Sequence, residues 1–150
     1  MDKFARGSYL MTHITLLNGR YFNKLLSKTE AVYSGEQGKI LTTLRDFGDD
    51  LTASEISKYS GLANNTLTSM LKKLETMSLI RSVAHPTDGR KKLFSLTDFG
   101  REQVALGYEV SQEVGKNFYQ GFKPQEIELF EKQLERILEN IERVNKSKND

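Results

Sequence analysis

The 150-residue chain contains no cysteine, no tryptophan, 2 prolines and 2 histidines. The lack of cysteine excludes disulfides, thiolate zinc sites, iron–sulfur clusters and cysteine-based redox switches. Two histidines are too few for a three-histidine metal centre in one chain, and we expect neither a metal nor another cofactor. No stretch approaches the roughly 20 consecutive apolar residues of a membrane span, and no signal peptide is evident. The sequence therefore predicts a soluble, cytoplasmic protein with no membrane partner.

Basic residues are concentrated in the middle of the chain. Residues 51–100 carry 7 basic and 4 acidic side chains, whereas residues 1–50 carry 7 and 6 and residues 101–150 carry 8 and 10. Three of the central cations are consecutive: Arg90, Lys91 and Lys92. A basic centre between neutral or acidic flanks favours contact with a polyanion, although ordinary scatter of surface charge also explains a difference of this size.

Helical periodicity dominates both ends of the chain. Apolar residues recur every three or four positions from Leu10 to Leu25, which predicts an amphipathic helix of about twenty residues. A second helix is expected after Gly35, with Gly48 as its C-terminal cap. A last helix after Pro124 carries a heptad-like stripe that suits either a dimer seam or an intramolecular core: Ile127, Phe130, Leu134, Ile137, Leu138, Ile141 and Val144. The polar residues 145–150 are predicted to fray.

The central segment predicts two short helices joined by a tight turn. Thr52 and Glu55 form a capping-box pattern, which marks the start of a helix that Ser60 and Gly61 then break. A further helix is expected from Asn64 or Asn65 to residue 77. Its apolar face consists of Leu67, Met70, Leu71 and Leu74.

A β-hairpin is predicted next. Residues 80–84 and 91–96 have strand-like composition, and Asp88-Gly89 between them is a strong hairpin signal. Thr97 and Asp98 then predict the start of a helix that runs to about residue 120. Helices followed by a two-stranded ribbon make a mainly α fold with one β-hairpin, a winged helix-turn-helix.

The helix that begins near residue 64 has an outer face suited to DNA. Near its start lie short hydrogen-bonding side chains, and lysines follow one turn later: Asn64, Asn65, Thr66, Thr68 and Ser69, then Lys72 and Lys73. Compact donors and acceptors can read base edges in a major groove while cations contact phosphates. A surface helix is polar outside in any case, so this face alone does not decide the function.

The hairpin loop strengthens the DNA hypothesis. Arg90 and Lys91 would project beyond the body, and arginine on such a ribbon can enter the narrow minor groove. Asp88 would either accept a charge-assisted hydrogen bond from Arg90 and hold its guanidinium at a set angle, or serve only as a turn former.

Taken together, these motifs resemble the MarR (multiple antibiotic resistance regulator) family of bacterial transcription factors. The resemblance covers nearly the whole chain and is carried by residues 36–41, 51–56, 74–81, 88–90 and 96–100. It implies one MarR-type domain over residues 1–150, with a winged helix-turn-helix core at 34–100 and helical dimerisation regions at 1–33 and 101–145. One departure is Ser78, where the family often has glycine; if this position needs a positive φ, serine costs on the order of 1 kcal/mol.

The resemblance also implies partners. A homodimer would place its recognition helices in successive major grooves of a pseudo-palindromic operator, with Arg90 in the minor groove. A small aromatic effector would bind between the dimerisation helices and the winged domain, where His13, Arg20 or Tyr33 could contact it; the other interpretation is that these three are ordinary interface or surface residues.

No catalytic motif is present. Neither His13 nor His85 stands in a nucleophile or metal motif, and no G-x-S-x-G sequence occurs. We therefore expect a sequence-specific, double-stranded-DNA-binding regulator, a homodimeric repressor and not an enzyme. The alternatives are a winged-helix protein–protein adaptor and a nonspecific DNA-binding protein without an effector.

Overall fold

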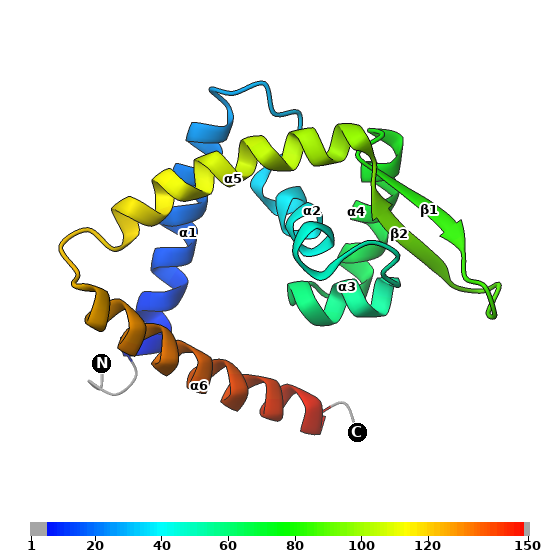
Figure 1. Cartoon of the computed structure of the whole chain (residues 1–150). Coiled ribbons are helices and arrows are strands. Elements are labelled where there is room, and N and C mark those ends of the chain that lie inside the picture. The colour runs from blue at the N-terminus through cyan, green and yellow to red at the C-terminus, as the bar shows by residue number, and fades with distance from the viewer. Residues whose placement is uncertain (1–5, 149–150) are drawn as a thin grey trace. The chain divides into compact units, whose positions relative to one another are not determined.

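The computed structural model describes residues 6–148, which form six helices and one two-stranded antiparallel sheet (Figure 1). The elements are α1 (Arg6–Leu26), α2 (Gly35–Phe47), α3 (Ala53–Ser60), α4 (Asn64–Thr76), β1 (Ile80–Ala84), β2 (Lys92–Leu96), α5 (Asp98–Phe118) and α6 (Pro124–Lys148). The predicted mainly α fold with a single hairpin is confirmed. None of these described helices has the length and apolarity needed to cross a bilayer.

The chain divides into two compact units, and the boundary lies within α5 after Val114. The first unit contains a core built by α2, α3, α4 and the start of the hairpin. Its most deeply buried large side chains are aliphatic: Ile40, Leu41, Leu44, Ile56, Leu67, Leu74 and Leu79. Because burying such a side chain stabilises the fold by about 1.5–3 kcal/mol, this core fixes the positions of α4 and the hairpin.

Side-chain caps define where the helices of this unit begin. Ser34 and Gln37 form a capping box at α2, and Thr52 and Glu55 form the predicted one at α3. Gly61 then ends α3 with a left-handed φ of 78°. The predicted helix start at Thr97 is also present, because its Oγ1 accepts a hydrogen bond from the Gly100 amide at 2.9 Å.

Helix α4 ends in a Schellman motif that contains a strained serine. The Leu79 amide donates to the Leu74 carbonyl at 3.0 Å, and the Ser78 amide donates to the Glu75 carbonyl at 2.9 Å. Leu74 and Leu79 are both fully buried, which adds the hydrophobic contact typical of this motif. Ser78 has a φ of 62°, so the position needs the left-handed backbone that favours glycine, and the hairpin still starts where the sequence predicts.

Replacing Ser78 by glycine should therefore stabilise the protein. Removing the Cβ relieves the left-handed strain, and the gain outweighs the greater freedom of the unfolded chain by about 0.5–1 kcal/mol. Urea unfolding at one fixed protein concentration measures this change. As a matched control, Ser69→Gly in the exposed interior of α4 should destabilise by roughly 0.5 kcal/mol; equal effects at the two positions would contradict the assignment of strain to Ser78.

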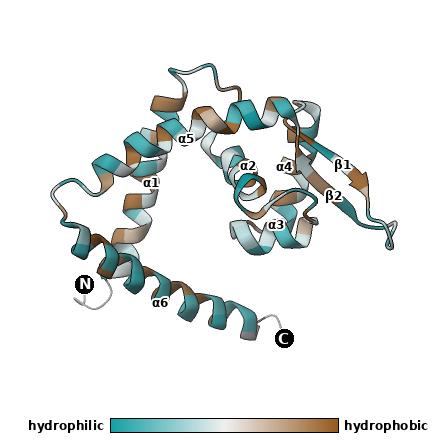
Figure 2. Cartoon of the chain, in the orientation of Figure 1, coloured by the Kyte–Doolittle hydropathy of each residue, from teal (hydrophilic) through white to brown (hydrophobic). Residues whose placement is uncertain are grey.

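The second unit joins the end of α5 to α6. Tyr119 packs its ring edge-on against Phe130 and donates its hydroxyl to a Glu131 carboxylate oxygen at 2.8 Å, and this hydrogen bond raises the pKa of Tyr119. Hydrophobic residues recur along α6 (Figure 2), and several of them are more than half exposed: Leu129, Leu138, Ile141 and Val144.

The prediction that the chain frays from residue 145 is wrong, because α6 continues to Lys148. Residues 139–148 contain neither glycine nor proline and are rich in good helix formers. Residues 149–150 of the predicted frayed segment lie outside the described range.

Candidate nucleic-acid interface

Helix α4 presents a continuous polar face on the opposite side from the core. The structure buries Leu67, Leu71 and Leu74 and leaves Met70 half-buried. All seven candidate DNA-contacting side chains of this helix are exposed: Asn64, Asn65, Thr66, Thr68, Ser69, Lys72 and Lys73. The division into faces that the helical period predicts is therefore present.

Local hydrogen bonds determine what this face can offer to a ligand. Thr68 donates its hydroxyl to the Asn64 carbonyl at 2.9 Å, and Asn65 accepts the Thr66 amide on its side-chain oxygen at 2.9 Å. Hydroxyl lone pairs and the Asn65 NH₂ group then point outward as acceptor and donor. Ala63, the N-cap residue of α4, provides no side-chain cap, so the amides of Asn64 and Asn65 at the start of the helix are suited to a phosphate.

The turn between α3 and α4 is held by its own hydrogen bonds. Ser57 donates its hydroxyl to the Leu62 carbonyl at 2.7 Å, and the Leu62 amide donates to Ser60 Oγ at 3.2 Å. Ile56 of α3 and Leu67 of α4 are both buried, so the two helices share the same core. This arrangement is the helix-turn-helix that the sequence predicts.

The base of the wing, the β1–β2 hairpin, is anchored by residues that sequence reasoning missed. Leu51 exchanges two backbone hydrogen bonds with Phe94, at 3.1 and 2.8 Å, and so adds a one-residue bridge to β2. Ser95 is buried, and its hydroxyl donates to the Asp50 carboxylate and accepts the Asp50 amide, both at 3.0 Å. Asp50 has a φ of 62°, which aspartate tolerates better than most residues.

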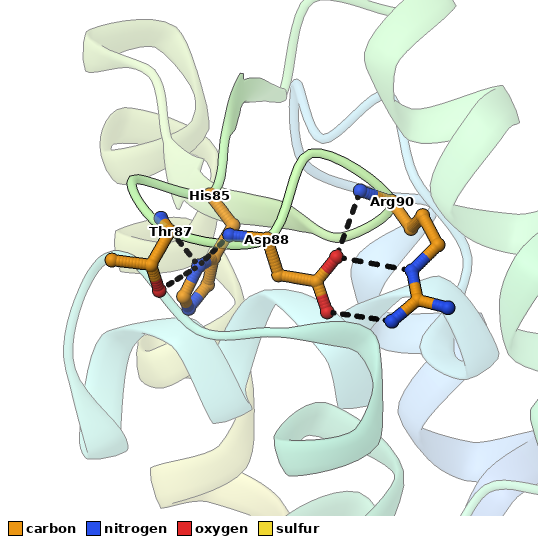
Figure 3. Close-up of polar contacts among 4 residues, drawn as sticks. All are labelled: His85, Thr87, Asp88 and Arg90. Carbon is orange, nitrogen blue, oxygen red and sulfur yellow. Dashed lines mark hydrogen bonds and ion pairs between the residues drawn. The ribbon is translucent and has the colours of Figure 1, made fainter.

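At the tip of the wing, Asp88 binds Arg90 as the sequence predicts (Figure 3). One carboxylate oxygen accepts the Arg90 backbone amide at 3.1 Å and the guanidinium Nε at 3.2 Å. Hydrogen bonds from the side chain and backbone of Arg90 lower the pKa of Asp88. The Arg90 side chain is 91% exposed, so its remaining N–H donors face solvent while Asp88 fixes the direction of the guanidinium.

The other wing cations lie beside this pair. Lys91 and Lys92 are exposed, and β2 begins at Lys92 instead of the predicted Lys91 because the Lys91 amide closes the turn on the Asp88 carbonyl at 3.0 Å. Three adjacent cations at the end of a ribbon are suited to a phosphate backbone.

The three candidate effector residues do not come together. His13 and Arg20 are exposed on α1, and the His13 ring meets Tyr9 edge-on at 5.9 Å. Tyr33 is 8% exposed; burial raises its pKa, while the Arg45 charge and a hydrogen bond with the Gly107 backbone partly oppose this shift.

Tyr33 does line an open hollow of ≈ 500 Å³ between the end of α1, the start of α2 and the end of α4. Neither His13 nor Arg20 lines this hollow; its walls are instead made by Asn23, Leu26, Ser27, Ala31, Val32, Tyr33, Ser34, Gln37, Lys73 and Met77. Among the side chains that the structure describes, no group of three or more His, Asp or Glu could hold a metal ion.

Comparison with known proteins matches residues 34–92, from the start of α2 to the end of the wing loop, to the MarR family. This central part of the chain is similar to the MarR family. The relatives of the chain include proteins named as HTH-type transcriptional regulators.

Individual relatives extend the similarity over most of the chain. The HTH-type transcriptional repressor IacR of Pseudomonas putida is 22% identical over 144 residues, which cover 94% of this chain and 84% of that protein. A cysteine-to-serine mutant of MarR from E. coli in complex with operator DNA has a TM-score of 0.80 at 22% identity and covers 92% of this chain and 99% of its own. The PcaV regulator from Streptomyces coelicolor, in complex with its natural ligand, has a TM-score of 0.80 at 19% identity. The match covers 93% of this chain and 96% of the PcaV chain.

Proposed function

We propose that this protein is a repressor that binds a pseudo-palindromic operator as a homodimer. The outer face of α4 would read bases in the major groove, with Lys72 and Lys73 on phosphates and Arg90 in the minor groove. The observation that carries the proposal is the wing tip, where a highly exposed guanidinium is held by Asp88 on the same winged helix-turn-helix as the polar face of α4. IacR is named a repressor, which supports the direction of regulation, and a DNA partner predicts action in the cytoplasm.

The proposed dimer rests on exposed apolar side chains. In α1, six large hydrophobic side chains are 40–59% exposed: Tyr9, Leu10, Met11, Ile14, Leu16 and Leu17. In α6, the side chains of Ile137, Leu138, Ile141 and Val144 are 41–56% exposed. Apolar surface on this scale favours a protein partner, and we propose that residues 1–33 and 101–145 bind a second copy around a DNA-binding core at residues 34–100.

A small-molecule effector is the third part of the proposal. The hollow beside Tyr33 contains Lys73 and Met77, both from the C-terminal end of α4. A ligand there would contact the recognition helix directly and so change its fit to two half-sites about 10 base pairs apart. The solved PcaV complex with its natural ligand supports a ligand for this fold. Tyr33 remains a proposed contact, whereas His13 and Arg20 would need the second copy to reach a ligand.

Fluorescence anisotropy tests the proposal. The protein would be titrated against labelled duplexes from its own upstream intergenic region and against scrambled duplexes of equal length, at several salt concentrations. We expect specific binding at least about 10³-fold tighter than binding to scrambled DNA, with a steep fall in affinity as salt rises.

Other results of this titration would favour the alternatives. Equal, weak binding to both duplexes would favour a nonspecific role or an operator elsewhere. No binding at low salt would contradict DNA binding and favour a protein–protein adaptor.

A further inference from the structure

The turn at the tip of the wing is organised by a histidine ring. His85 follows β1 directly, and its backbone amide donates to the Lys91 carbonyl at 3.0 Å. Its imidazole folds over the loop so that Nδ1 accepts the backbone amides of Thr87 and Asp88, both at 3.2 Å (Figure 3). The Thr87 hydroxyl lies 3.4 Å from the same nitrogen. One ring nitrogen therefore accepts hydrogen bonds from two backbone amides of the loop.

This geometry requires a neutral imidazole with its hydrogen on Nε2, because a protonated Nδ1 cannot accept a hydrogen bond. The ring acts as the side chain of an Asx turn does, by supplying a local acceptor to amides two and three residues further on. Without it, these amides would bond to water and the loop would lose a constraint.

The same contacts connect His85 to the DNA-binding guanidinium. His85 Nδ1 fixes the amide of Asp88, and the carboxylate of Asp88 in turn holds the backbone amide and Nε of Arg90. The backbone amide of Asp88 is thus hydrogen-bonded to the His85 ring, and its carboxylate is hydrogen-bonded to Arg90. In Figure 3 the imidazole and the guanidinium lie on opposite sides of Asp88, and each is hydrogen-bonded to this residue.

We propose that His85 is a positioning residue for the wing. As a neutral acceptor it holds Asp88, and Asp88 then presents the Arg90 guanidinium in one direction. This inference rests on the proposed function, in which Arg90 contacts the operator. His85 itself need not touch DNA.

A set of variants at pH 8, where histidine side chains are neutral, tests the proposal by operator affinity. His85→Asn keeps an acceptor at the δ position, whereas His85→Gln moves the same amide one carbon further out and His85→Phe keeps a ring without an acceptor. We expect Asn to stay within about 2-fold of the original affinity and both Gln and Phe to lose roughly 5- to 10-fold, the equivalent of about one hydrogen bond.

A double-mutant cycle shows whether the effect passes through Arg90. Each His85 variant is combined with Arg90→Ala. If His85 acts by positioning Arg90, Gln and Phe should weaken binding in the original protein and leave the affinity of the Arg90→Ala protein unchanged. Thermal unfolding should stay the same throughout, because the loop lies outside the core.

Three results would overturn the proposal. Equal losses with and without Arg90 would make His85 an independent contact, and equal affinities of the Asn and Gln variants would remove the role of Nδ1. A His85→Phe variant that binds the operator with the original affinity would also show that Nδ1 has no role. If the Arg90→Ala variant binds the operator with the original affinity, the proposed role of the wing in DNA binding is wrong. This single variant therefore distinguishes a failure of the proposed function from a failure of the His85 proposal.

Discussion

Replacing Gly100 by alanine should destabilise the protein by roughly 2–3 kcal/mol, the largest stability effect that we expect from a single added methyl group. A Cβ on Gly100 would overlap the backbone carbonyl oxygen of Leu79 and would lie 3.3 Å from a methyl group of Leu96. Alanine normally favours a helix over glycine by about 1 kcal/mol, so the overlap must outweigh a gain in helix propensity.

The Leu79 carbonyl cannot move away without cost. It accepts the Thr97 amide at 3.1 Å, and the Thr97 hydroxyl, which lies 3.1 Å from it, donates to the neighbouring Ser78 carbonyl at 2.6 Å. Leu79 also follows the strained Ser78, and its side chain is fully buried. Relief of the overlap therefore requires a shift of α5 away from the base of the wing, which breaks bonds that set the start of α5.

Urea unfolding at one fixed protein concentration measures this effect, because the unfolding midpoint of the proposed dimer would depend on concentration. Gly115→Ala is the matched control: it lies in the same helix, and an added Cβ there meets nothing within 4 Å. We expect this control to be neutral or stabilising by up to about 1 kcal/mol. A Gly100→Ala protein as stable as the control would contradict the close approach of Leu79.

Helical periods and local chemistry allowed much of the fold to be predicted. The buried face of α4 follows from Leu67, Leu71 and Leu74 at helical spacing, and the capping box at Thr52 follows from two residues three positions apart. The hydrogen bond between Asp88 and Arg90 was predictable because an acidic and a basic side chain two residues apart share one tight turn. Each of these signals is local in sequence.

Contacts between distant segments left no such signal. The bridge between Leu51 and Phe94 involves one residue of each segment, too few to produce an alternating pattern. The two bonds between Ser95 and Asp50 join positions 45 residues apart. His85 was missed because a lone histidine beside a proline matches no motif, although its place six residues before Lys91 in a tight loop is a usable clue.

Only those parts of the candidate site that lie within a single helix or hairpin could be predicted from the sequence. The exposed residues of α4 and the wing follow from period and turn chemistry. The hollow beside Tyr33 depends on how α1, α2 and α4 meet, and its lining residues Asn23, Gln37 and Lys73 come from three separate helices. His13 and Arg20 lie on α1 but do not line this hollow, so the resemblance that suggested all three residues did not show whether they meet in one pocket.

Replacing Arg90 by alanine should cost about 10²-fold in operator affinity, a few kcal/mol for a dimer that loses one guanidinium from each wing. The side chain is highly exposed and its only described protein partner is Asp88, so its removal should leave dimer assembly and thermal unfolding unchanged. The salt dependence should also weaken, by a slope of roughly 2 per dimer if each arginine neutralises one phosphate charge.

Arg90→Lys separates charge from shape. Lysine keeps the positive charge, but it lacks the planar fork that Asp88 holds and that fits a narrow groove. We expect Arg90→Lys to keep the salt slope and the affinity for scrambled DNA while losing much of the preference for the operator. A lysine variant with full operator preference would show that the wing supplies charge alone.

Asp88→Asn decides between the two interpretations of the acidic residue. Asparagine forms turns as readily as aspartate but offers only a neutral acceptor to Arg90, so it removes the charge-assisted part of the brace. If Asp88 positions the guanidinium, the variant should lose operator affinity even though removing a negative charge beside DNA favours binding. An affinity equal to or tighter than the original would make Asp88 a turn former only, and Arg90 would then reach the groove without a fixed direction.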